Sequence, residues 1–302
     1  MRRASRLLFY SVALLIGVTS LSGFTTLWPK GLVPRFSVKA NTFPGSDLDP
    51  RVGGELEVNE YLLSAGVGRF HEDGRFYNLM LTYGYHDYAF SDTAPFWNSE
   101  DGSVETLKID AAFSTLTHGD LGPYLQVRAT GGGGDGFGVS DARSLFAIGG
   151  LRWAYDGSLD LVFGALWWDS ASEGTEVLPF AGLRWELSNN FILSTRNGVI
   201  LEWMLDDWGD HWANFSLLYR SRDFALAPPV SSLPAAGEGV VEETAWELLA
   251  EYRWQLSRSV SFRLLAGYRF DRRYTYHLDE TPVDRLTVDD GPVLGLECRF
   301  GF

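Results

Sequence analysis

The chain has 302 residues, of which 45% are hydrophobic, 15% aromatic and 21% charged, and its formal net charge is −14. This composition excludes an intrinsically disordered polymer, and the acidic excess argues against a nucleic-acid partner because acidic surfaces repel phosphate. The single cysteine, Cys298, excludes an internal disulfide framework and a cysteine-based zinc cluster.

The first residues predict an export signal. Three arginines precede an apolar stretch over residues 7–18, which is followed by small residues. This order is typical of a secretory signal peptide, and the stretch is shorter than the roughly 20 residues that a spanning helix needs. We therefore expect residues 1–22 to be cleaved and residues 23–302 to form a single domain, with 23–52 either partly disordered or holding a first strand.

The rest of the chain alternates between apolar and polar residues, which is the period of a β-strand. Leu107 and Ile109 share one face of such a segment, for example, while Lys108 and Asp110 share the other. Many segments have about ten residues or more, the length of a tilted β crossing of a bilayer. We expect strands near residues 58–70, 76–90, 104–117, 123–130, 144–155, 158–169, 178–188, 212–224, 243–256, 259–274 and 292–302.

The connections between these segments alternate in length. Short turns are expected at 71–75, 118–122, 156–157, 188–190 and 256–259, and long polar loops at 91–103, 131–143, 170–177, 225–242 and 275–291. Short turns on one side and long loops on the other are typical of a bacterial outer-membrane barrel, with turns in the periplasm and loops outside.

The number of strands has two interpretations. Residues 191–205 keep their apolar side chains in one phase, which fits one long strand and twelve strands in all. If residues 196–198 instead form a three-residue hairpin loop with Gly198 in the left-handed conformation, the apolar side chains before and after the loop still lie on the same face. A first strand at 36–42 then restores the alternation of connections and gives fourteen, which we favour.

The fold class that follows is all-β, a closed antiparallel transmembrane barrel of 12–14 strands. A closed barrel satisfies every backbone group within hydrocarbon. Aromatic residues such as Trp153, Trp185 and Trp246 stand near strand ends on the apolar faces, as interfacial girdles require. The opposite faces carry charges that a soluble core would not tolerate.

The final segment, "VLGLECRFGF", resembles the carboxy-terminal assembly signal of Gram-negative outer-membrane β-barrel proteins. Leu294, Leu296, Phe300 and Phe302 carry the resemblance, and Cys298 departs from the usual larger apolar residue. The resemblance implies that the barrel-assembly machinery engages this strand and that lipid and lipopolysaccharide surround the barrel in the outer membrane. The chain also looks like an uncharacterised family of porin-like outer-membrane β-barrel domains, which implies no activity, and the oligomeric state stays open.

The polar faces, projected inward, supply charges of both signs to the lumen. These charges favour a passive, porin-like channel that sorts small solutes by sign. The alternative is a structural or ligand-binding surface barrel whose lumen is plugged by paired charges. The lumen candidates are Lys108, Asp110, Arg128, Arg152, Asp160, Arg184, Glu186, Arg196, Glu202, Arg220, Glu247, Glu251, Arg253, Arg263, Arg269, Glu297 and Arg299.

A hydrolase is the rival from another class, because a histidine beside carboxylates can activate water. The candidate groups are His86 with Asp87, His211 with Asp206, Asp207 and Asp210, and His277 with Asp279 and Glu280. No serine stands in a recognisable nucleophile setting, so we assign no catalytic residue, and we assign no cofactor or metal ligand.

Two further stretches suggest ligands and are interpreted as loops. The glycine run at 131–138 lacks the helix that a phosphate cradle needs and misses the spacing of a calcium-binding nonapeptide. The acidic stretch at 279–291 has oxygens that suit Ca²⁺ or Mg²⁺, but a solvated loop is the simpler interpretation.

Overall fold

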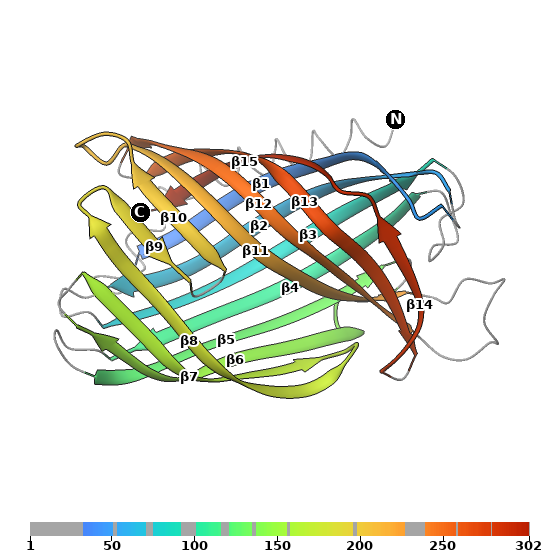
Figure 1. The fold of residues 1–302 in the computed structure, drawn as a ribbon, viewed down its shortest axis with the longest axis horizontal. Coiled ribbons are helices and arrows are strands. Elements are labelled where there is room, and N and C mark those ends of the chain that lie inside the picture. Colours follow the sequence, from blue (N-terminus) through green and yellow to red (C-terminus); the bar gives the residue numbers. More distant parts are fainter. Residues whose placement is uncertain are drawn as a thin grey trace.

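The computed structural model describes residues 33–50, 53–70, 75–91, 101–115, 121–134, 137–155, 158–195, 198–226, 239–257, 259–278 and 280–301, and it contains strands and no helices in these ranges (Figure 1). The strands are β1 (Val33–Asp47), β2 (Glu55–Phe70), β3 (Phe76–Phe90), β4 (Asp101–Ser114), β5 (Leu121–Gly134), β6 (Ala142–Ala154), β7 (Leu159–Ser170), β8 (Gly174–Ser188), β9 (Phe191–Ser194), β10 (Val199–Met204), β11 (His211–Leu226), β12 (Gly239–Ser257), β13 (Val260–Leu278), β14 (Thr281–Val288) and β15 (Gly291–Gly301). Within the described ranges, no helix is long and apolar enough to cross a membrane.

The strands close into a ring of antiparallel neighbours. Each strand from β1 to β13 pairs with the next along the chain, and β15 pairs with both β13 and β1. β14 pairs with the far part of β13, from Arg272 onward, while β15 pairs with the near part, so these two strands occupy one place in the ring. The barrel therefore has fourteen places.

The interpretation with fourteen strands is confirmed. β9 and β10 form a hairpin in which Ile200 lies opposite Ser194, and Gly198 has a φ of 105°, which is in the left-handed region as the sequence predicts. The expected first strand at 36–42 lies within β1, which pairs with β15 from Arg35 to Thr42 and closes the ring.

Two of the predicted long loops are wrong. Residues 170–177 are mostly strand, because β7 and β8 are joined across residues 171–173 alone. Residues 275–291 contain the end of β13 and all of β14. Both segments continue the ladder of their neighbour despite polar or proline-containing sequence, because ladder hydrogen bonds join backbone groups whatever the side chains. The long loop expected at 131–143 is also shorter, since β5 continues to Gly134.

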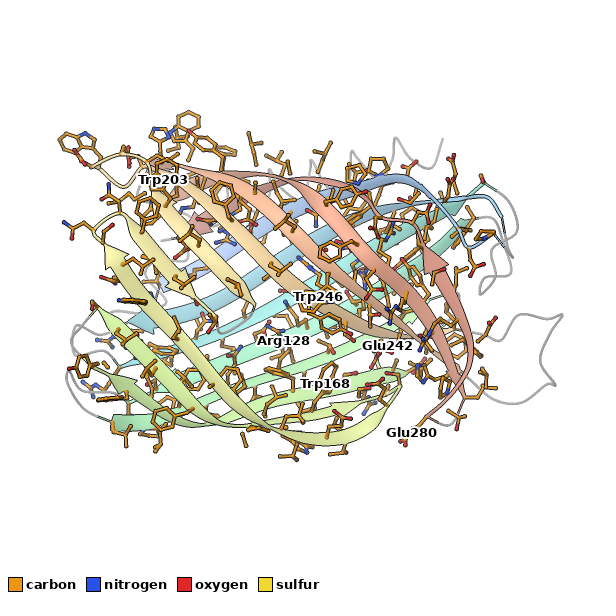
Figure 2. All side chains as sticks on the ribbon, viewed as in Figure 1. Arg128, Trp168, Trp203, Glu242, Trp246 and Glu280 are labelled. Atoms are coloured by element: carbon orange, nitrogen blue, oxygen red, sulfur yellow. The ribbon has the colours of Figure 1, made fainter. Side chains whose placement is uncertain are left out.

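The apolar face of the strands points outward, as the sequence predicts. Leu264 and Leu296, which lie opposite each other on β13 and β15, are 57% and 51% exposed. Trp203 and Trp246 lie on the outer surface at different heights (Figure 2). Their charged neighbours Glu202 and Glu247 occupy the opposite face by the alternation of the strand.

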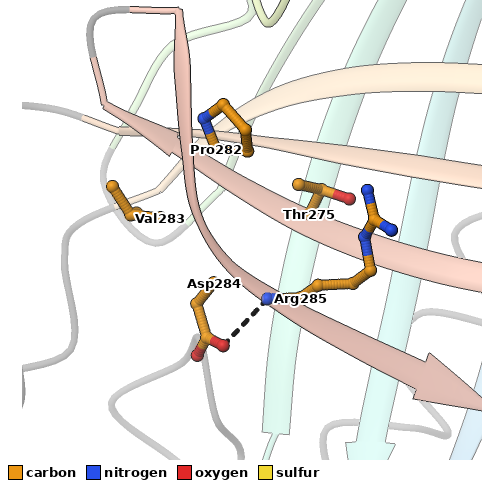
Figure 3. Close-up of a pocket in the computed structure, with 5 residues that line it drawn as sticks. All are labelled: Thr275, Pro282, Val283, Asp284 and Arg285. Atoms are coloured by element: carbon orange, nitrogen blue, oxygen red, sulfur yellow. Dashed lines mark hydrogen bonds between the residues drawn. The ribbon is translucent and has the colours of Figure 1, made fainter.

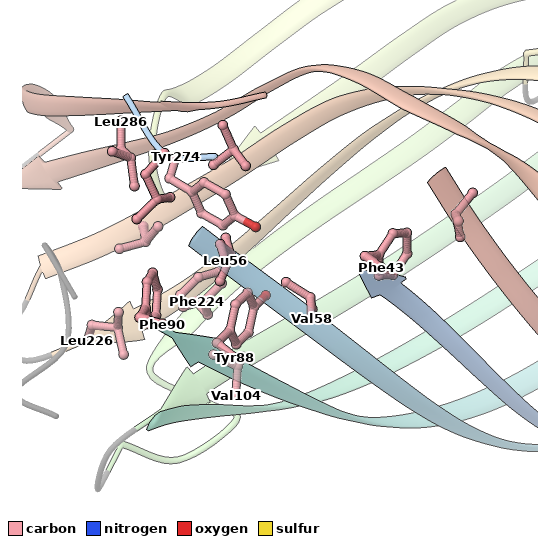
Figure 4. Close-up of a cluster of buried hydrophobic side chains, with 14 of the residues drawn as sticks. Phe43, Leu56, Val58, Tyr88, Phe90, Val104, Phe224, Leu226, Tyr274 and Leu286 are labelled. Atoms are coloured by element: carbon pink, nitrogen blue, oxygen red, sulfur yellow. The ribbon is translucent and has the colours of Figure 1, made fainter. Parts of the chain in front are cut away.

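At the loop end the pattern reverses, and apolar side chains fill the interior (Figure 4). β12 and β13 have 19 residues each, about twice the 9–11 that a bilayer crossing needs, so the strands continue beyond the outward apolar belt. In this extension water surrounds the barrel, and burial of apolar groups inside becomes favourable. The fully buried members are Phe43, Leu56, Val58, Tyr88, Val104, Phe224, Leu226, Val241, Tyr274 and Tyr276. This core was not predicted.

The loop end of β11, which remains paired with β12 up to Leu226, also contacts β5 across the ring. Ala225 of β11 pairs in parallel with Gly133 of β5, although β6–β10 lie between these strands in chain order. Side chains at the glycine run would prevent this approach, because a Cβ on Gly132 would lie 2.5 Å from the carbonyl oxygen of Asp223. The glycine run, predicted to be a loop, is therefore the strand segment that admits β11.

Several predictions fall outside the described residues. These are the cleaved segment 1–22, residues 23–32 of the expected domain, all or most of the expected turns at 71–75, 118–122 and 156–157, most of the expected loops at 91–103 and 225–242, the lumen candidate Arg196, the terminal Phe302 and the acid Asp279.

Candidate functional site

A hub of buried charges occupies the interior next to the apolar core. Its first centre is Arg222 of β11, whose Nη2 lies 2.5 Å from Glu243 Oε2 on β12 and 3.0 Å from Glu60 Oε1 on β2. His86 of β3 contacts the same guanidinium and lies 3.6 Å from Glu60. Arg222 therefore joins strands from two opposite parts of the wall.

The second centre of the hub is Arg269 of β13. Its Nε donates to Glu247 Oε1 at 2.9 Å, and its Nη1 donates to Glu243 Oε1 at 3.3 Å. Two hydroxyls complete the shell of Glu243, since Tyr88 and Tyr274 each donate to it at 3.0 Å. Glu243 thus accepts from both arginines and both tyrosines, which offsets the cost of burying its charge.

The hub and the core close one side of the lumen at the loop end. Tyr88 and Glu243 are 155 positions apart in the chain, and Glu60 and Arg222 are 162 apart, so their bonds span the interior between β2–β3 and β11–β12. A wide water-filled bore through this part is therefore excluded. Any open space must lie on the side of β5–β10.

Most of the charged residues that the sequence places in the lumen form ion pairs with one another. Among the candidates that the structure describes, two do not form a pair: Arg253 lies over the ring of Trp212, with Cζ 4.8 Å from the centroid, and Glu202 stands opposite Asn214 in register. Whether the lumen candidates, paired or not, line a conducting path stays a prediction. The pairs are Arg128–Asp110 (2.5 Å), Lys108–Asp110 (3.3 Å), Arg152–Asp160 (2.6 Å), Arg184–Glu186 (2.7 Å), Arg269–Glu247 (2.5 Å), Arg263–Glu251 (3.0 Å), Arg299–Glu297 (2.6 Å) and Arg220–Glu247.

Three charged residues of the hub were not predicted from the sequence, and His86 was predicted only as a catalytic candidate. Glu60, Arg222 and Glu243 lie in the parts of their strands where the outward face becomes polar, so a search for charges opposite an apolar face does not select them. A usable signal was present, because Glu57 and Asn59 alternate with Leu56 and Val58 in the phase of a soluble sheet.

A cavity of about 280 Å³ lies on the other side of the lumen. Phe146, Leu166, Trp168 and Phe180 form its apolar wall on β6, β7 and β8, and Arg128 lies on its floor on β5. On the facing side, β11 contributes Tyr219, Ser221 and Asp223. By the alternation of the strand, these residues share a face with Phe215, which points outward nearer the turn end. The cavity exists because β11 has turned inward.

The wall is interrupted beside this cavity. β9 and β10 have only 4 and 6 residues, and they pair with the turn-side ends of β8 and β11. From Leu183 back to Gly174, the loop-end part of β8, no described strand lies between β8 and β11 (Figure 1). Arg128 and Trp168 are seen between the ribbons of β8 and β11 (Figure 2).

The edge of β8 is adapted to this interruption. Leu183 N donates to Thr195 Oγ1 at 3.1 Å, and Thr195 N donates to Leu183 O at 2.9 Å, so odd-numbered residues of β8 direct their backbone groups to this side. Pro179 is one of them and has no N–H to leave unpaired. Proline within a sheet is confined largely to edges of this kind.

The histidines proposed for catalysis lie at separate places. His86 is part of the hub, and His277 is buried at the loop end with Nε2 3.6 Å from Glu242. His211 lies at the turn end, where its Nδ1 is 2.6 Å from the Tyr252 hydroxyl. The three histidines therefore do not form one site, and each has a polar neighbour of its own.

The acidic turn and loop residues also have structural partners. Asp206 Oδ1 accepts from the backbone N–H groups of Asp210 and His211 at 3.0 and 3.2 Å, which closes the β10–β11 turn. On the β13–β14 hairpin, a shallow open hollow is lined by Thr275, Pro282 and their neighbours (Figure 3). Within the described ranges, no group of three or more His, Cys, Asp or Glu is placed to hold a metal ion.

The last strand has the amphipathic form expected from the sequence. Leu294 and Leu296 are each 51% exposed on the outer face of β15, and Phe300 lies 6.2 Å from the ring of Phe36 on β1. β15 closes the ring against β1. Its recognition by the assembly machinery stays a prediction.

The ring has fourteen antiparallel places, its outer surface carries an apolar belt, and its interior is charged at the level of this belt. These features together are typical of one kind of fold. The chain has the fold of an outer-membrane β-barrel.

No family model and no curated relative matches the chain. Among solved structures, the barrel is similar to a FadL homologue of Pseudomonas aeruginosa, at 12% identity and a TM-score of 0.43, with 90% of each chain covered. It is similar to an outer-membrane channel of Pseudomonas putida F1, at 12% identity and a TM-score of 0.44, with 91% of this chain and 97% of that one covered. It is also similar to the P. putida toluene transporter TodX, at 10% identity and a TM-score of 0.40, with 91% of each chain covered.

Proposed function

We propose that the protein is a narrow outer-membrane channel through which small solutes pass on the side of β5–β8 and β11. The observation that supports this proposal is the uneven filling of the interior. Hub and core occupy one side, whereas the other side holds the cavity above Arg128. A general porin would need a continuous wide lumen, so the passive route is restricted in width.

Below the cavity, the ion pairs Arg128–Asp110 and Arg152–Asp160 supply polar groups along the route. Paired charges of both signs let water and small polar solutes pass while they lower the preference for either ion. We therefore expect weak ion selectivity.

Single-channel recording in planar bilayers tests the proposal. Purified, folded protein should give steps smaller than those of a general trimeric porin, and Arg128→Glu should shift the reversal potential in a salt gradient toward cation preference. Arg273→Glu is the matched control, because Arg273 is exposed at the loop end and pairs with Asp271. Absence of steps from folded protein would favour the alternative function, a surface barrel with a plugged lumen.

A further inference from the structure

The interruption between β8 and β11 lies beside the outer part of the apolar belt. Trp167 of β7, which alternates with the outward Phe163, stands opposite Val177 of β8. Val177 therefore lies at the height where an aromatic girdle is expected, and Leu183, where pairing ends, lies deeper in the belt. The interruption thus opens at the height of the outer leaflet.

The cavity behind this opening combines an apolar wall with one available cation. Phe146, Leu166, Trp168 and Phe180 present rings and an aliphatic side chain. Arg128 is 34% exposed, and its Nε bonds Asp110 at 2.5 Å. Among the described residues, no protein acceptor for its two terminal nitrogens is found. These nitrogens have the fork geometry that binds a carboxylate.

The acidic residue of the cavity lining, Asp223, already accepts hydrogen bonds from other groups of the protein. Asp223 accepts from Ser144 Oγ at 2.6 Å, from Ser172 Oγ at 3.1 Å and from Ala171 N at 3.2 Å. Its carboxylate is therefore directed to the β7–β8 connection and away from Arg128. The second arginine of the lining, Arg222, is held by the glutamates of the hub.

We propose that small amphipathic molecules with a single anionic head, such as medium-chain carboxylates, enter this cavity from the outer leaflet through the opening between β8 and β11. The apolar chain lies against Trp168 and Phe180, and the head binds Arg128. The proposal rests on the proposed channel function, for which it names the substrate class and the side of access.

The open edges are consistent with this occupant. An unpaired strand edge facing hydrocarbon is costly, and it persists in membranes only where it lines a cavity that holds water or polar groups. Pro179 removes one such donor on β8. Hydrated polar groups beside the edge form hydrogen bonds with its remaining unpaired backbone groups. The chain of the ligand fills the apolar part of the cavity.

The first experiment measures binding to the full chain in lipid nanodiscs by calorimetry, with octanoate and 1-octanol as probes and empty nanodiscs subtracted. We expect saturable octanoate binding that weakens about tenfold in Trp168→Ala. Arg128→Gln should abolish the preference for octanoate over octanol. The matched controls are Trp167→Ala, the outward neighbour of Trp168, and Arg184→Gln, which lies outside the cavity lining; both should leave affinity within about twofold.

Lack of saturable binding, or equal losses in Trp167→Ala and Trp168→Ala, would overturn the proposal. If Trp168→Ala does not fold, as judged by heat-modifiable gel mobility, Phe180→Ser replaces it.

The second experiment tests the side of access. The tryptophan fluorescence of the native protein minus that of Trp168→Phe gives the emission of Trp168. Lipids with brominated chains should quench this emission, and octanoate should reverse the quenching. A difference signal that brominated lipid does not quench would overturn access from the leaflet. Conductance recorded on the same preparations separates the two proposals: steps without octanoate binding overturn the substrate class alone, and binding without steps overturns the channel.

Discussion

The backbone of Ala225 in β11 pairs in parallel with that of Gly133 in β5, whereas every other pairing of named strands in the described barrel is antiparallel. This contact divides the loop end of the lumen. One side holds the apolar core and the hub, and the other holds the cavity. The glycines of β5 permit it, because they leave room for the backbone of β11.

Gly132→Val should separate β11 from β5. The added Cβ would lie 2.5 Å from Asp223 O, and overpacking of this kind costs about 1–3 kcal/mol. We expect a lower free energy of unfolding in denaturant and larger conductance steps. Gly149→Val is the control, since a Cβ on Gly149 meets nothing within 4 Å. Equal effects of the two substitutions would show that β11 does not depend on this approach.

Glu243→Ala should destabilise the barrel strongly. The substitution leaves Arg222 and Arg269 with less compensation inside the hub, and breaking a buried ion pair costs about 3–5 kcal/mol. The unfolding midpoint in urea, measured in vesicles, provides the test. Glu186→Ala removes a half-exposed pair with Arg184 and should cost below about 1 kcal/mol. A similar shift in both variants would contradict the hub as a stabilising element.

Leu264→Arg should place a charge in the middle of the apolar belt. Leu264 is 57% exposed and lies between the outward Phe262 and Tyr268, so we expect a loss of about 2–4 kcal/mol. Trp246→Arg, opposite Phe270 and closer to the loop end than Tyr268, should cost less because it lies near the outer interface. Val283→Arg on the β13–β14 hairpin is the control outside the belt. Equal costs at all three positions would contradict the assigned belt.

Thr195→Val should loosen the end of the β8–β9 ladder. The hydroxyl of Thr195 accepts from Leu183 N, and a buried N–H without an acceptor costs about 1–3 kcal/mol. Hydrogen exchange at the Leu183 amide should become faster. Thr195→Ser keeps the hydroxyl and should retain the protection of the native protein; loss of protection in both variants would show that the hydroxyl is not the relevant acceptor.

The candidate site could be predicted only in part. Arg128, Asp110, Arg152 and Asp160 were found because they alternate with an apolar outward face in regular strands. Trp168 and Phe180 were not, since an inward aromatic beside an apolar face gives no signal of its own. Glu60, Arg222 and Glu243 of the hub were not found because the alternation reverses above the belt, where solvent replaces lipid outside the wall.

The sequence by itself determined the closed barrel and its outward apolar face, because alternation is a local property of the chain. Through Gly198 it favoured fourteen places over twelve, and the pairing of the strands decided between them. Only the tertiary structure decided that β11 crosses to β5 and that β8 keeps a free edge beside a cavity. These features depend on contacts such as that of Tyr88 with Glu243, 155 positions apart. No local period encodes which distant side chains meet inside a lumen.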